Sequence, residues 1–94
     1  MHASFICSID YPTLSALQTL DYYLLDSTDP YDMLPRYGTK VVQNDSAGRL
    51  VMEHSVADIT SMREYAKRVL ALLIEHSVPP WTLCEVIEEI LTRV

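Results

Sequence analysis

Residues 39–54 of this chain read TKVVQNDSAGRLVMEH. Residues 39–43 and 49–53 contain three valines and a threonine, which favour strands, and the five residues between them are NDSAG. Asparagine, aspartate, serine and glycine favour turns because they adopt left-handed backbone or hydrogen-bond to their own main chain. The pattern therefore predicts a β-hairpin whose two strands are joined by residues 44–48.

A further strand is predicted at the N-terminus, where residues 3–9 alternate between apolar and polar side chains. A period of two residues is typical of a strand with one buried face. Ile6 is the one exception to this alternation. The side chains expected on the buried face are Ala3, Phe5, Cys7 and Ile9.

The segment after this strand is predicted to form a helix over residues 12–26. Pro12 would lie in its first turn, where a missing N–H does no harm, and the leucines that follow return at helical spacing. Residues 27–38 contain two prolines and a glycine and are predicted to form a loop. Loops of this length in small domains tend to be functional.

Two more helices are predicted in the C-terminal third. One begins at Asp58 or Ser61 and ends near Ser77, because the prolines that follow cannot continue it. The other covers residues 82–93, and both begin with the S/T-x-x-E pattern of a capping box. The first is expected to bury Ile59, Met62, Ala66, Val69, Leu70 and Leu73. The second is expected to bury Leu83, Ile87, Ile90, Leu91 and Val94.

The element order is therefore expected to be β-α-β-β-α-α, an α+β fold. A small antiparallel sheet, made of the N-terminal strand and the hairpin near residues 39–54, would be packed by about three helices. Residues 1–94 would form a single compact domain, since 94 residues leave no room for two. The alternative is a mostly helical fold in which the hairpin is an arm and residues 3–9 pair with another chain.

Composition and sequence patterns indicate where in the cell this domain is expected. The longest unbroken apolar run is residues 69–74, far short of the roughly 20 residues that a membrane-spanning helix needs, so no membrane partner is expected. The N-terminus lacks the basic region of a signal peptide. Cys7 and Cys84 form no C-x-x-C pair and are interpreted as reduced thiols of the core. The cytoplasm is the expected location.

The charge argues against direct binding of nucleic acid. The net charge is −6, whereas nucleic-acid affinity comes from basic side chains that neutralise phosphates. Residues 1–35 contain five aspartates and neither lysine nor arginine. The last predicted helix adds the glutamates Glu85, Glu88 and Glu89 on its outer face.

No catalytic, metal or cofactor site is expected. The soft ligands His2, Cys7, His54, His76 and Cys84 show none of the spacings of a metal site. Two glycines in the whole chain cannot make a glycine-rich phosphate loop. A nucleophilic Cys84 activated by His54 or His76 is the enzymatic alternative, which needs the thiol and a base within hydrogen-bond reach.

The most suggestive region for function is residues 21–37, where tyrosines alternate with aspartates and a Met-Leu pair lies between two prolines. Tyrosine is enriched at interface hot spots, and a proline-framed loop loses less entropy on binding. The bland alternative is that these tyrosines cover a small core. The expected protein-binding residues are Tyr22, Tyr23, Asp26, Asp29, Tyr31, Asp32, Met33 and Tyr37, together with Glu85, Glu88 and Glu89.

The leading hypothesis is a small, acidic, non-enzymatic protein-binding or regulatory module. Its partner would be another protein with a basic surface, and one form of the hypothesis is an inhibitor that occupies the basic groove of a nucleic-acid-handling protein. A small enzyme or enzyme subunit using a Cys/His pair is one alternative. A purely structural homodimer that pairs through residues 59–94 is another.

Overall fold

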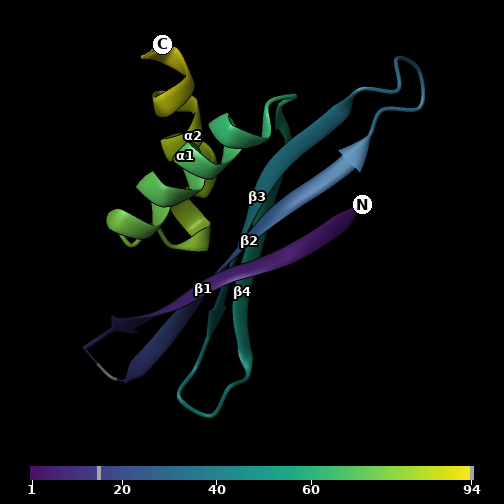
Figure 1. Ribbon diagram of the computed structural model, residues 1–94. Coiled ribbons are helices and arrows are strands. Elements are labelled where there is room, and N and C mark those ends of the chain that lie inside the picture. The colour runs from purple at the N-terminus through teal and green to yellow at the C-terminus, as the bar shows by residue number, and fades with distance from the viewer. Residues whose placement is uncertain (15, 94) are drawn as a thin grey trace.

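The computed structural model describes residues 1–14 and 16–93; Ser15 and Val94 lie outside the described residues. Four strands come first and two helices follow (Figure 1). The strands are β1 (His2–Pro12), β2 (Leu17–Thr28), β3 (Pro35–Asn44) and β4 (Leu50–Thr60). The helices are α1 (Arg63–Glu75) and α2 (Leu83–Thr92), with the 3-10 turn η1 (Pro80–Thr82) before α2.

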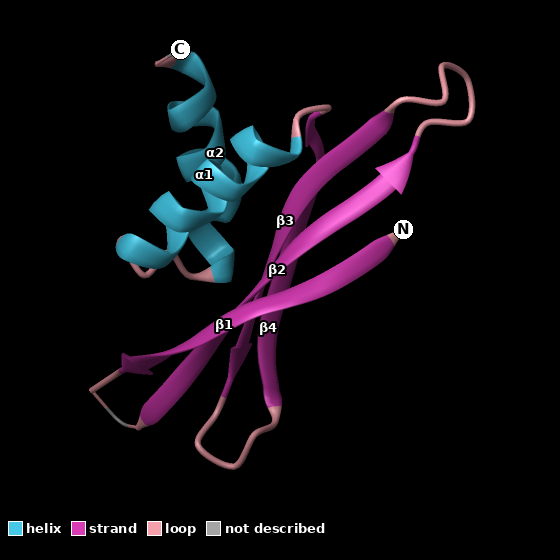
Figure 2. Ribbon diagram, in the orientation of Figure 1, coloured by secondary structure: helices cyan, strands magenta, loops and turns pink. Residues whose placement is uncertain are grey.

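The strands form one antiparallel sheet in the order β1-β2-β3-β4, so each strand pairs with its neighbour in the chain. Figure 2 shows both helices on the same side of this sheet, which extends beyond them. The molecule is elongated, with extents of 47 × 27 × 17 Å, because the strands are longer than the helices that cover them. One face of the sheet therefore has no helix over it.

The prediction of a helix over residues 12–26 is wrong. Pro12 is the last residue of β1, and residues 17–26 belong to β2. Leu20 and Leu24 are four positions apart, a spacing that fits both one helical turn and two strand periods. Tyr22, halfway between them, is also buried, so the period is two. The order β-α-β-β-α-α with three helices is thereby corrected to β-β-β-β-α-α with two.

The N-terminal strand is confirmed, but its side chains do not all share one face. The register shifts between Phe5, which pairs with Tyr23, and Cys7, which pairs with Tyr22. Because Tyr22 and Tyr23 are adjacent, Phe5 and Cys7 lie on opposite faces, and Phe5 is exposed rather than buried. Ile6, the exception in the alternation, is the extra residue of this β-bulge.

The hairpin at residues 39–54 is confirmed and is longer than expected at both ends. Its turn is held by the Asp45 carboxylate, which accepts hydrogen bonds from the backbone N–H groups of Ala47 and Arg49, each at 2.9 Å. Gly48 takes a φ of 81°, the left-handed region that glycine favours. The expected loop at residues 27–38 is correspondingly shorter, because β2 continues to Thr28 and β3 begins at Pro35.

The two C-terminal helices are confirmed, with a later start for α1. Strand β4 continues to Thr60, so α1 begins at Arg63, and among the described residues neither Asp58 nor Ser61 caps it through a side chain. Two residues after the end of α1, Ser77 has a φ of 50°, in the left-handed region. The Val78 N–H then donates a hydrogen bond to the Leu73 carbonyl at 3.0 Å. This is the hydrogen bond of a Schellman motif.

The core lies between the helices and the sheet face that they cover. Tyr22 lies at its centre, and its hydroxyl donates a hydrogen bond to the Val78 carbonyl at 2.9 Å. Ile59 belongs to β4 and Met62 is exposed, so two of the six residues expected in the α1 stripe do not lie on it. The buried core residues are Leu20, Tyr22, Leu24, Val41, Ala66, Val69, Leu70, Leu73, Val78, Leu83 and Ile87.

Neither helix in the described part of the chain has the length and apolar character needed to cross a bilayer.

Candidate protein-binding site

The connection between β2 and β3, residues 29–34, carries the most exposed large apolar side chains of the region that the sequence singled out. Tyr31 is 96% exposed, Met33 is 72% exposed and Leu34 is 50% exposed. Figure 1 shows this loop at one end of the sheet, well apart from α2. We call residues 29–34 the tip loop.

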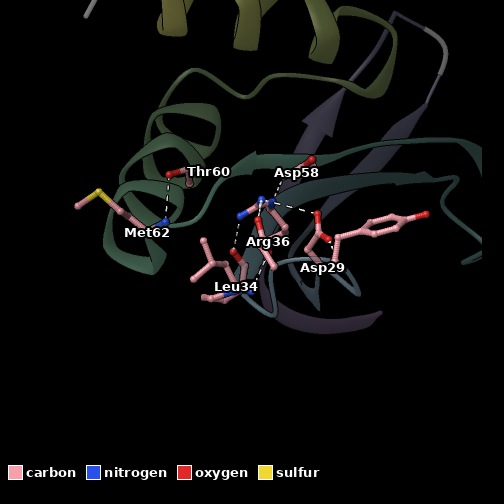
Figure 3. A network of polar contacts seen from close by, with 9 residues as sticks. Asp29, Leu34, Arg36, Asp58, Thr60 and Met62 are labelled. Atoms are coloured by element: carbon pink, nitrogen blue, oxygen red, sulfur yellow. Dashed lines mark hydrogen bonds and ion pairs between the residues drawn. The ribbon is translucent and has the colours of Figure 1, made fainter.

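Arg36, the second residue of β3, holds the base of the tip loop (Figure 3). Its Nη2 lies 2.7 Å from Asp32 Oδ2 and 3.6 Å from Asp29 Oδ2. Its Nε lies 3.0 Å from Asp58 Oδ1, on β4. One guanidinium therefore joins two carboxylates of the loop to a third from the edge strand.

The two loop aspartates also bind their own main chain. Asp29 Oδ1 accepts a hydrogen bond from the Tyr31 N–H at 2.7 Å, and Asp32 Oδ1 accepts one from the Leu34 N–H at 2.8 Å. The Leu34 N–H, and then Arg36, hold the pKa of Asp32 below its usual range, so this carboxylate is ionised at neutral pH. These contacts fix the loop although its tip is in solvent.

Met33 has a φ of 60°, in the left-handed region. A methionine rarely takes this conformation, and residues held in it cluster at functional sites. The Met33 N–H donates to the Asp29 carbonyl at 2.9 Å, and the Asp29 N–H donates to the Leu34 carbonyl at 3.0 Å. The surrounding contacts thus hold a strained residue in place.

Asp58 reaches Arg36 because β4 bulges opposite Gly38. Tyr37 pairs with Thr60 but Thr39 pairs with Val56, so three β4 residues lie opposite one residue of β3. A Cβ on residue 38 would lie 2.7 Å from the Ala57 Cα and would also clash with the Val56 carbonyl oxygen. Asp58 itself has a φ of 59°, which completes the bulge.

The structure gathers only part of the expected binding set. Asp29, Tyr31, Asp32 and Met33 form the tip loop. Asp26 and Tyr37 are paired across β2 and β3 next to it and are half-buried. Tyr22 is fully buried in the core, so it cannot contact a partner in this structure.

The remaining expected residues lie elsewhere. Tyr23 is on the sheet face without helices, where its ring meets the Phe5 ring edge-on with centroids 5.6 Å apart and lies 5.5 Å from Lys40 Nζ. Glu85, Glu88 and Glu89 are on α2. The expected binding set did not contain Leu34, Arg36, Gly38 or Asp58, and Asp58 was named only as a possible start of a helix. Gly38 was assigned to the predicted loop, whereas it lies inside β3, where a glycine often marks a close backbone approach.

The Cys/His alternative has little geometric support. Cys84 is exposed, so its interpretation as a core thiol is wrong, whereas Cys7 does pack against the core. His54 and Cys84 line the same shallow hollow of about 280 Å³, but the one polar contact of the Cys84 sulfur among the described residues is Glu88 Oε1 at 3.9 Å. Activation of a thiol needs a base or a positive charge beside it, and a carboxylate opposes it. His76 lines a different groove.

Within residues 1–14 and 16–93, no three His, Cys, Asp or Glu side chains lie close enough together to hold a metal ion.

Comparison with known proteins places the chain in a family. The model of a family of unknown function, DUF6514, matches residues 11–93, and the chain belongs to this family. No curated protein and no solved structure matches the chain.

Proposed function

We propose that this member of the DUF6514 family is a non-enzymatic protein-binding module of the cytoplasm that contacts its partner through the tip loop. The observation that carries the proposal is the exposure of Tyr31, Met33 and Leu34 on a loop that Arg36 fixes through three carboxylates. Exposed apolar side chains on a fixed loop favour binding, because little conformational entropy is lost when the partner arrives.

The side-chain types also favour a protein partner. Tyrosine is enriched at interface hot spots, and methionine adapts to irregular apolar pockets. Both side chains are exposed, while the backbone N–H groups of Tyr31, Met33 and Leu34 are already hydrogen-bonded within the loop. The partner is therefore expected to offer an apolar pocket that receives Tyr31 and Met33.

The charge around the loop favours a basic rim on that pocket. Three carboxylates surround one guanidinium, which leaves an excess of negative charge beside an apolar tip, and the whole chain carries −6. Complementary potentials accelerate encounter and select the partner. A protein with a basic groove, such as one that handles nucleic acid, fits this chemistry, and occupation of that groove would inhibit it. The two free cysteines agree with a reducing compartment.

The test is capture of partners from the native host with three immobilised baits: the wild type, the double variant Tyr31→Ala/Met33→Ala, and Met62→Ala. Met62 is 65% exposed and lies outside the tip loop, so it is a matched apolar control. We expect a basic protein to be retained by the wild type and by Met62→Ala and to be lost with the double variant. Circular dichroism should show all three baits folded. Equal capture by all three would contradict the proposal.

A second measurement tests the inhibitory form of the proposal. The captured protein, once purified, is mixed with a fluorescent nucleic acid, and the chain is titrated in. We expect the wild type to displace the nucleic acid and the double variant to fail. If the partner still binds the nucleic acid when it is saturated with the wild-type chain, the chain binds its partner but does not inhibit it.

A further inference from the structure

A groove of about 590 Å³ runs between α1 and α2. Leu72 of α1 and Val86 and Ile90 of α2 give it apolar walls, and Glu85 and Glu89 also line it. The tip-loop residues do not line this groove, so it is a second surface.

The apolar stripe of helix α2 reaches from the core to the edge of the groove. Leu83 and Ile87 are buried in the core against the sheet, whereas Val86 and Ile90 are half-buried and turn toward the groove. On α1, Leu73 is buried but the neighbouring Leu72 is 40% exposed. Leu72, Val86 and Ile90 therefore leave a partly exposed apolar strip beside the core, and apolar surface with a polar rim is typical of an interaction site. Nothing in the described part of the chain fills the groove that this strip lines.

The charges of α2 indicate what would cover it. Glu85, Glu89 and Arg93 line the groove, which leaves an excess of one negative charge among these three side chains. Arg93 pairs with Glu89, while Glu85 has no ion pair among the described residues. A second copy of this chain packed groove against groove would bring two net acidic linings together, and like charges in an interface are unfavourable. The occupant is therefore expected to be basic.

We propose that this groove binds a short amphipathic helix of a partner protein, with apolar residues at i, i+3, i+4 and i+7 and with lysine or arginine beside them. The apolar residues would contact Leu72, Val86 and Ile90, and a basic residue would pair with Glu85. The ten residues of α2 are about 15 Å long, which matches a partner helix of about three turns. Docking of an amphipathic helix in an apolar groove is a recurring mode of recognition.

The test uses three fluorescent synthetic peptides: an amphipathic leucine–lysine helix, a scrambled peptide of the same composition, and a leucine–glutamate helix of the same pattern. Fluorescence anisotropy gives each Kd. We expect the leucine–lysine helix to bind at least about tenfold more tightly than either of the others. Equal binding of the scrambled peptide would show unspecific attraction and would overturn the proposal.

Variants inside and outside the groove test whether the leucine–lysine peptide binds there. Leu72→Asp and Glu85→Lys should each weaken binding about tenfold. Their controls are Leu91→Asp and Glu88→Lys, because Leu91 is 39% exposed, Glu88 is on α2, and neither lines the groove. The controls should stay within about twofold of the wild type. Equal losses in both sets would overturn the proposal.

Analytical ultracentrifugation tests the alternative that a second copy of this chain fills the groove. A wild-type dimer that Leu72→Asp converts to a monomer would show that a second copy fills the groove, and the proposal would be wrong. The inference does not rest on the tip loop. The variant Tyr31→Ala/Met33→Ala should bind the leucine–lysine helix as the wild type does, so the two proposals fail separately.

Discussion

The hydroxyl of Tyr22 donates a hydrogen bond to the main-chain carbonyl of Val78 at 2.9 Å. Tyr22 lies in the second strand and Val78 in the turn between the helices, 56 positions later. Both residues are buried. This contact gives the carbonyl of the interhelical turn a partner inside the core and ties the helix pair to the sheet.

Substitution Tyr22→Phe should lower the free energy of unfolding by about 1–3 kcal/mol, because the buried Val78 carbonyl would lose its donor while packing stays nearly the same. Urea denaturation followed by circular dichroism measures the loss. Tyr31→Phe is the control, since the Tyr31 side chain is almost fully exposed. Equal stability of the two variants would show that the buried hydrogen bond contributes nothing.

The same tyrosine predicts an alkaline loss of stability. Burial raises the pKa of Tyr22 well above its usual value, and Cys7 and Tyr11 add to the rise. In the unfolded chain this hydroxyl titrates near pH 10. Its contribution is therefore full below about pH 10 and decreases at higher pH, because the unfolded state then loses a proton that the folded state keeps. The stability difference between wild type and Tyr22→Phe should narrow from about pH 10 to about pH 11.5. A constant difference over this range would contradict the linkage.

Gly38→Ala should destabilise the fold by about 1–3 kcal/mol, since the new Cβ would force β3 away from the bulge in β4. The comparison is Gly48→Asn. Gly48 also has a special conformation, with a φ of 81°, but a side chain there meets open space, and asparagine tolerates the left-handed region. The Tm of Gly38→Ala in thermal unfolding should be well below the Tm of Gly48→Asn. The reverse order would mean that the close approach at the bulge is not a constraint.

Thr39→Val should stabilise the protein by about 1 kcal/mol. The Thr39 side chain is fully buried, and its Oγ1 has no hydrogen-bond partner among the described residues. Valine keeps the shape and removes the unpaired hydroxyl. Thr60→Val is the contrasting variant, because Thr60 Oγ1 accepts a hydrogen bond from the Met62 N–H at 3.0 Å before α1 and its loss should destabilise. Urea midpoints that move in the same direction would refute this contrast.

Arg36→Gln should loosen the tip loop with a modest effect on global stability, about 1 kcal/mol, because its ion pairs lie near the surface. Hydrogen exchange should accelerate at the Met33 N–H, because this group donates a hydrogen bond to the Asp29 carbonyl within the loop. The Asp32 pKa, followed by NMR, should rise toward its usual value, since Arg36 is one of the groups that lower it. Arg49→Gln, at the opposite hairpin turn, should leave exchange in the tip loop unchanged.

Local patterns were sufficient for several elements. The NDSAG turn predicted the β3–β4 hairpin, because turn chemistry at residues 44–48 depends on few distant contacts. The second and third predicted helices correspond to α1 and α2, since the prolines after Val78 separate two amphipathic stretches. The tip loop lies inside the loop predicted at residues 27–38, because prolines and a glycine indicate a loop in any fold.

Local patterns failed where one spacing fits two structures. Leu20 and Leu24 satisfy a helix and a strand equally, and the choice depends on whether β1 and β3 lie alongside to pair with β2. The Arg36–Asp58 contact was not visible either, because it needs the bulge opposite Gly38 to bring residues from two strands together.

The sequence by itself determined the elements whose stabilising contacts are close in the chain: the β3–β4 turn and the two helices with the proline turn between them. It also determined the excess of acidic side chains. The tertiary structure alone decided that residues 17–28 are a strand, that Tyr22 is core rather than surface, and that Asp29, Asp32 and Asp58 meet at one arginine. The physical reason is that a strand satisfies its backbone hydrogen bonds on other strands, whereas a helix satisfies them within itself.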